Sequence, residues 1–108
     1  MKGETRSRVG AELKERTLAF AVAILRFAET LPNITATRVV TSQWLRPATA
    51  VGTNYREANR AESKADFFHK MAIVHKEAAE TESWLQLCIA ILWVRSHPPK
   101  NSGLKAVN

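Results

Sequence analysis

The chain has 108 residues, of which 45% are hydrophobic and 24% are charged, and its formal net charge is +6. These values are typical of one small folded domain and argue against a chain that is disordered throughout. The single cysteine, Cys88, excludes an internal disulfide framework and fits a reducing compartment, so we expect a cytoplasmic protein. Residues 1–16 carry no apolar stretch of the signal-peptide type, and the most apolar run, Trp84 to Val94, is too short to span a bilayer.

The first periodic segment, from about Ala11 to Leu31, predicts a helix that Pro32 ends. Apolar residues recur in it at steps of three and four, as on one face of a helix: Leu13, Thr17, Phe20, Ile24, Phe27 and Leu31. Leu18, Val22 and Leu25 widen that face. Residues 1–10 precede the pattern, and we expect them to form a basic, flexible tail.

A second helix is predicted from about Thr35 to Arg60. Its apolar positions are Val40, Trp44, Ala48, Val51, Tyr55 and Ala58. Pro47 interrupts this segment, where a proline costs about 3 kcal/mol in a regular helix, and Gly52 adds about 1 kcal/mol. We therefore expect a kinked helix, with a break into two pieces as the alternative.

The third helix is predicted from Lys64 to Val94, and it carries the clearest pattern. Ser63 and Asp66 form a capping-box sequence at its start. A heptad seam follows at alternating steps of four and three: Phe67, Met71, Val74, Ala78, Thr81, Leu85, Cys88 and Leu92. A second apolar side holds Ile73, Trp84, Leu87 and Ile91. Residues 96–108 are expected to form a second basic, flexible tail.

These segments predict an all-α protein, an antiparallel up-down bundle of three long helices over residues 11–95. Such helices leave more apolar surface than one chain can cover, so we expect a homo-oligomer.

Two polar stripes face each other in the predicted hairpin of the second and third helices. One holds Gln43, Arg46, Ala50, Asn54 and Glu57, and the other holds Lys70, Ile73, Glu77, Glu80 and Trp84. Antiparallel packing brings Glu57 toward Lys70 and Arg46 toward Glu77 or Glu80. We interpret these residues as an ion-pair network that fixes helix register. The alternative, a metal or acid–base carboxylate site, is disfavoured because no Glu-x-x-His sequence occurs.

No phosphate loop, nucleophile elbow or plausible cysteine–histidine pairing occurs in the sequence. We therefore expect no enzymatic activity, no cofactor, no metal and no small-molecule substrate.

The positive charge is concentrated at the two ends of the chain, which carry +2 over residues 1–16 and +3 over residues 83–108, against +1 over residues 17–82. Candidate phosphate-binding residues are Lys2, Arg6, Arg8, Arg95, Lys100 and Lys105. The alternative is that these are solvated, solubilising tails. Trp44, Trp84 and Trp93 could stack bases, but their helical apolar pattern favours packing in a core or interface.

Several spaced motifs over about residues 12–88 are similar to those of a known family. They are Gln43 with Arg46, Asn54 to Ala58, Ser63 to Phe67, Lys76 to Thr81, and Trp84-Leu85. In these the chain resembles the small bacterial four helix bundle proteins, also called 23S rRNA intervening-sequence proteins. The resemblance implies an antiparallel up-down bundle without catalysis that assembles as a homopentamer.

A related branch, the accessory proteins of diversity-generating retroelements, resembles a basic pentamer that binds nucleic acid and a reverse transcriptase, and this implies nucleic-acid association for the present chain only by analogy. Two departures from the family are visible: Pro47 stands where a serine is usual, and the family's fourth helix is expected to be missing or replaced. The function expected from all of this is self-association and assistance to an RNA- or DNA-containing assembly. The alternative is a protein-interaction or structural module, such as a truncated family member, with no nucleic-acid role.

Overall fold

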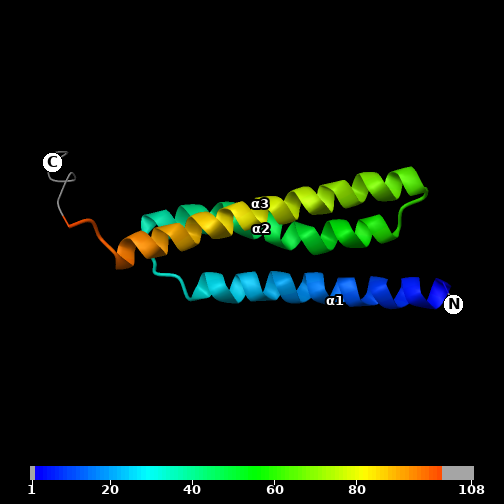
Figure 1. The fold of residues 1–108 in the computed structure, drawn as a ribbon, viewed down its shortest axis with the longest axis horizontal. Helices are drawn as coiled ribbons and strands as arrows, with labels where there is room; N and C mark the ends of the chain where they lie inside the picture. The colour runs from blue at the N-terminus through cyan, green and yellow to red at the C-terminus, as the bar shows by residue number, and fades with distance from the viewer. Residues whose placement is uncertain (1, 101–108) are drawn as a thin grey trace.

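The computed structural model describes residues 2–100 of the chain, with side chains from residue 8 onward. Three helices follow one another: α1 (Lys2–Glu29), α2 (Thr35–Asn59) and α3 (Lys64–Ser96). Each runs antiparallel to the one before it, and together they form an elongated rod (Figure 1). No strand occurs within residues 2–100. The predicted all-α architecture of three long antiparallel helices is confirmed.

Helix α1 begins at Lys2 and not near Ala11, so the expectation of a flexible tail over residues 1–10 is wrong from residue 2 onward. The apolar pattern is absent from these residues, but lysine, glutamate and arginine are good helix formers and no proline interrupts them. The predicted inward face is confirmed farther along, where Ile24 is buried and the other five positions are half-buried. Leu18, Val22 and Leu25 are exposed.

The turn between α1 and α2 is organised by Thr37. Its side chain is buried, and its hydroxyl lies within hydrogen-bonding distance of the carbonyl oxygens of Pro32 and Ile34. The Ile34 backbone N–H donates back to the same hydroxyl at 3.4 Å. The start of a helix leaves its first N–H groups without partners in the helix. The Ile34 N–H is one of these, and it donates both to the Thr37 hydroxyl and to the Pro32 carbonyl oxygen.

Helix α2 is the central helix and packs against both of the others, more extensively against α3 (Figure 1). All six of its predicted apolar positions are buried. The helix continues through Pro47, which is itself buried, so the two-piece alternative is wrong. The packing of α2 on both sides supplies the free energy that offsets the local cost of the proline.

The core lies between the C-terminal half of α1, the N-terminal half of α2 and the C-terminal half of α3. Trp44 is at its centre with no exposed surface, and its ring meets Phe27 edge to face at a centroid distance of 5.7 Å. Half-buried residues of α1 and α3 complete the cluster, among them Phe20, Trp84 and Leu92. The indole N–H of Trp44 has no hydrogen-bond partner among the described residues.

Helix α3 begins where the capping sequence predicts. The Ser63 side chain accepts a hydrogen bond from the Asp66 N–H at 3.0 Å. The returning bond differs from a regular capping box, because the Asp66 carboxylate accepts from the backbone N–H of Glu62, at 3.3 Å. The heptad seam faces inward over its whole length: Thr81 and Cys88 are buried, and its other members are half-buried.

Candidate nucleic-acid interface

The predicted polar network joins α2 to α3 through one arginine. Arg46 lies 3.4 Å from the Glu77 carboxylate and 3.2 Å from that of Glu80. The Arg46 side chain is 62% exposed, while Glu77 is 13% and Glu80 37% exposed. This confirms that Arg46 pairs with Glu77 and Glu80 in the predicted antiparallel register. Both bridges lie at the surface, where ion pairs contribute little stability.

The other half of that network is different from the prediction. Lys70 does not pair with Glu57 but with Asp66 on its own helix, at 3.0 Å and a spacing of four residues. The i,i+4 partner is within reach along one helix face, whereas Glu57 would have to be met across the hairpin. Gln43 is exposed and Asn54 half-buried, and neither makes a side-chain hydrogen bond to any described residue.

Asp66 combines two roles at the start of α3. The hydrogen bond from Lys70 lowers the pKa of its carboxyl below the usual value of 3.8, and the bond from the Glu62 backbone N–H acts in the same direction. The charged carboxylate also lies in the first turn of a helix, where the helix dipole favours it. These are structural roles at the hairpin turn and not signs of acid–base chemistry.

The predicted phosphate-binding residues are divided between the two ends of the rod. Arg8 is exposed near the start of α1, while Arg95 and Lys100 are exposed at and beyond the end of α3, at the opposite end (Figure 1). The side chains of Lys2 and Arg6, and the whole of Lys105, lie outside the described part of the structure. Arg8 and Arg95 of one chain therefore cannot contribute to the same binding site.

One end of the rod gathers basic residues that are far apart in the sequence. Residues 26–43 and 83–100 form this end, which contains four lysines and arginines but a single acidic residue, Glu29. We call it the cationic end. Its basic residues are Arg26, Arg38, Arg95 and Lys100, all of them exposed. The guanidinium of Arg38 donates to the neutral oxygens of Asn33 and Thr35 and so keeps its charge uncompensated there.

Sequence reasoning missed Arg26 and Arg38, because it counted charge along the chain. Residues 17–82 are nearly neutral overall, but most of their acidic residues lie in the middle of the rod or at the hairpin turn. Folding therefore separates charges that cancel in a linear count. The signal available for Arg38 was the stretch from Thr30 to Arg56, which contains no acidic residue, whereas Arg26 is followed by Glu29 and had no such signal.

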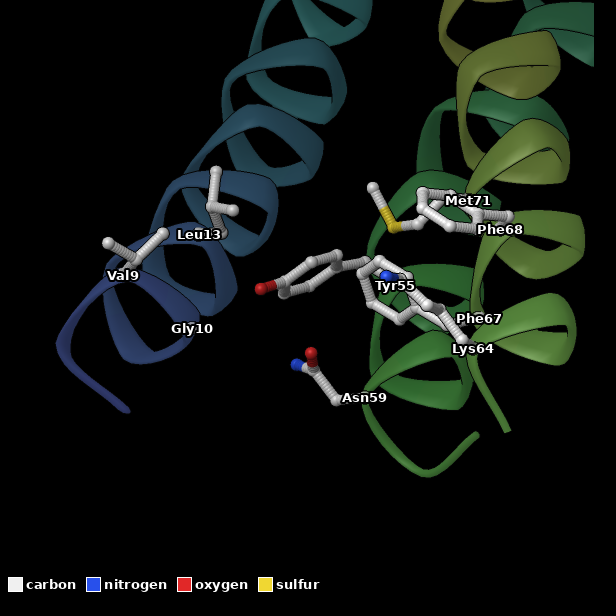
Figure 2. A pocket seen from close by; sticks show the side chains of 9 residues that line it. All are labelled: Val9, Gly10, Leu13, Tyr55, Asn59, Lys64, Phe67, Phe68 and Met71. Carbon is white, nitrogen blue, oxygen red and sulfur yellow. The ribbon is translucent and has the colours of Figure 1, made fainter. Parts of the chain in front are cut away.

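A groove opens at the other end of the rod, between the N-terminal half of α1 and the α2–α3 hairpin (Figure 2). Its volume is about 790 Å³. Tyr55 points from α2 toward α1, and Phe67 and Met71 form the α3 wall. The lining residues are Val9, Gly10, Leu13, Tyr55, Asn59, Lys64, Phe67, Phe68 and Met71. They are mainly apolar and include no carboxylate or histidine, so the groove has no acid–base pair.

Other chemically reactive groups do not form a site in the described residues. The Cys88 side chain has no exposed surface, and burial raises the pKa of its thiol, which keeps it in the unreactive protonated form. Within residues 8–100, whose side chains the structure describes, no cluster of three or more histidine, cysteine or acidic side chains could hold a metal ion. No helix in this range is long and apolar enough to cross a membrane.

The three tryptophans have different environments. Trp44 is fully buried and Trp84 is half-buried, which confirms the expected packing role for both. Trp93 is 60% exposed and lies at the cationic end. Packing against the described residues therefore does not account for the position of Trp93 in the apolar pattern of α3.

Comparison with known proteins adds two findings. The model of the family described as 23S rRNA-intervening sequence protein matches residues 11–98. A crystal structure of a protein of unknown function from the S23 ribosomal protein family of Bacteroides thetaiotaomicron has a similar fold, with a TM-score of 0.67 and 37% sequence identity. The match covers 92% of this chain and 84% of that one. No curated protein matches the sequence.

Proposed function

The chain belongs to the 23S rRNA-intervening sequence protein family, and from that premise we propose that it is a non-catalytic bundle protein that self-associates and binds RNA through its cationic end. The observation that carries this proposal is the charge of that end, with four basic residues against one acidic residue. The match to a ribosomal protein family over most of the chain favours RNA as the nucleic acid.

The physical basis is phosphate neutralisation. Lysine and arginine side chains that neutralise RNA phosphates release the counterions condensed on the RNA, and this favours binding. Neighbouring carboxylates would repel the phosphates and weaken binding. At the cationic end, residues 83–100 contain no acidic residue at all. The opposite end mixes both signs, and near the hairpin turn Lys70 is already paired with Asp66. The cationic end is therefore the better phosphate-binding surface.

Self-association is supported by apolar residues that the chain leaves open. Leu18, Val22 and Leu25 recur at steps of four and three on the outer side of α1, and their exposed fractions are 57%, 41% and 41%. Residues at this spacing form a continuous stripe on a helix. Such a stripe is unfavourable in water and is covered in many proteins by a second subunit. A mass measurement in solution tests this part, and a stable monomer at high concentration would contradict it.

RNA binding is tested by titrating the full chain into labelled RNA over a salt series. With three or four phosphate contacts, the logarithm of the binding constant should fall with the logarithm of salt concentration with a slope of about −2 to −3.5. The double variant Arg26→Glu/Arg95→Glu should abolish this binding. The double variant Arg56→Glu/Lys76→Glu makes a matched control, because it reverses two exposed charges away from the cationic end.

An equal loss of RNA affinity in the control and in Arg26→Glu/Arg95→Glu would show that net charge alone drives binding. It would contradict a site at the cationic end. Absence of binding by the unmodified chain at about 50 mM salt would refute the RNA role, because electrostatic binding is strong there. A protein-interaction role would then remain, supported by the exposed stripe on α1.

A further inference from the structure

The last turns of α3 expose an apolar surface within the cationic end. Trp93 is 60% exposed and Val94 54%, and Ile89 lies one turn before Trp93 with 53% of its surface exposed. A tryptophan is among the most favourable side chains to bury, so leaving most of one in water at a folded helix end is unfavourable. Its position calls for an explanation in terms of a ligand.

Trp93 is one member of a stacked ring pair. The His97 imidazole lies against it with a centroid distance of 4.4 Å and an angle of 10° between the ring planes. The two residues are four apart, so they project from the same face of the helix. Edge-to-face contacts occur elsewhere in the chain, as between Phe27 and Trp44, but this pair is nearly parallel.

The backbone holds this ring pair in place. The His97 N–H donates to the carbonyl oxygen of Trp93 at 2.9 Å and to that of Val94 at 3.2 Å, which closes the helix. The imidazole Nδ1 lies 3.1 Å from the same Trp93 oxygen. Pro98 and Pro99 follow directly and restrict the chain that leaves the helix. The two rings are therefore ordered before any ligand binds, which lowers the entropic cost of binding.

The charges around the rings identify the class of ligand. Lys100 follows His97 by three residues, Arg95 lies between Trp93 and His97 in the sequence, and no acidic residue occurs from Ser83 to Lys100. Flat aromatic faces within a basic, acid-free segment match a nucleotide, since bases stack on aromatic rings while lysine and arginine contact the backbone. Paired bases are already stacked within a duplex, so such a surface selects an unpaired base.

We propose that the Trp93–His97 ring pair is a stacking platform for an unpaired base of single-stranded RNA, with Lys100 contacting an adjacent phosphate. This deepens and rests on the RNA-binding role proposed above. It assigns different tasks to different residues of the cationic end: Arg26 and Arg38 add charge, whereas the ring pair distinguishes single strands from duplexes.

The test compares variants of the full chain on two RNAs, a single strand of about 12 nucleotides and a duplex of the same length. Trp93→Leu keeps an apolar side chain but removes the aromatic face. It should weaken single-strand binding about 5- to 100-fold and leave duplex binding unchanged. Trp93→Phe should restore most of the affinity. Val94→Ala is the matched control, because it alters an equally exposed apolar neighbour without a ring.

Each outcome separates the two proposals. If the unmodified chain binds neither RNA, the RNA-binding role itself fails. If it binds both RNAs and Trp93→Leu changes neither affinity, the platform is refuted while the cationic end remains. If Val94→Ala weakens binding as much as Trp93→Leu, the surface acts as a general apolar contact and the stacking proposal is overturned. Far-ultraviolet circular dichroism of each variant verifies that the helices are intact.

Discussion

Trp44 offers a test of how the core is stabilised, because it combines complete burial with an N–H group that has no partner among the described residues. We consider two substitutions at this position. Trp44→Ala removes the whole ring and its edge-to-face contact with Phe27. Trp44→Phe removes the N–H group and one ring but keeps an aromatic side chain against the same neighbours.

The two changes should differ greatly in free energy of unfolding. Trp44→Ala should cost about 3–5 kcal/mol, as large-to-small changes at buried aromatic positions do. Trp44→Phe loses about 40 Å³ of side-chain volume, and the cavity costs about 1 kcal/mol at about 24 cal/mol per Å³. The lost burial of the removed apolar atoms costs roughly a further 1 kcal/mol. It also removes a buried unpaired donor, whose desolvation costs about 1–3 kcal/mol. We therefore expect Trp44→Phe to be within about 1 kcal/mol of the unmodified chain.

Urea unfolding followed by far-ultraviolet circular dichroism measures both variants, since this signal does not depend on the tryptophan that is removed. Trp93→Phe is the control, because the same change at an exposed position should leave the midpoint unaltered. A loss of more than about 2 kcal/mol in Trp44→Phe would show that the N–H group contributes favourably and would refute the reasoning.

Three further predictions follow from local geometry. Gly10→Ala should stabilise the chain by up to about 1 kcal/mol, because alanine favours a helix more than glycine does and the added Cβ would lie at an ordinary 3.8 Å from the Tyr55 hydroxyl. A melting temperature below that of the unmodified chain would contradict this. A double-mutant cycle on Arg46 and Glu80 should give a coupling of about 0.2–1 kcal/mol that added salt weakens, since the arginine is largely exposed; a coupling above about 2 kcal/mol would contradict the exposure argument. The pKa of Asp66 is lowered in the folded chain, so its stabilising effect is present above about pH 4 and lost as the pH falls through the folded pKa. The melting temperature of Asp66→Asn should consequently fall less on acidification than that of the unmodified chain, and parallel pH profiles would rule this out.

The helices and their inward faces were predictable because the buried positions of a helix recur in the sequence at steps of three and four. Every predicted apolar position of α2 is buried, and Arg46 meets Glu77 and Glu80 as the antiparallel register requires. The start of α1 was missed because residues 2–10 are helical without an amphipathic pattern. The Glu57–Lys70 pair was wrong because a partner on the same helix, Asp66, competes with one across the hairpin.

The candidate interface was only partly predictable for a different reason. Arg95 and Lys100 stood out as cations without neighbouring acids, but Arg26 and Arg38 join them through the fold alone. The apolar pattern of α3 also places Trp93 among core-like positions, although it is 60% exposed. Periodicity shows that a face is apolar, whereas only the packed chain shows whether that face is covered.

The central position of α2 has a consequence for the order in which the protein opens. Helix α1 packs against α2 and is separated from the α3 wall by the groove at its N-terminal half. Its detachment would leave the α2–α3 hairpin and the Arg46 bridges in place. Amide hydrogens in the first half of α1 should therefore exchange with solvent through a partial opening of lower free energy, while those of α2 exchange only when the whole chain unfolds.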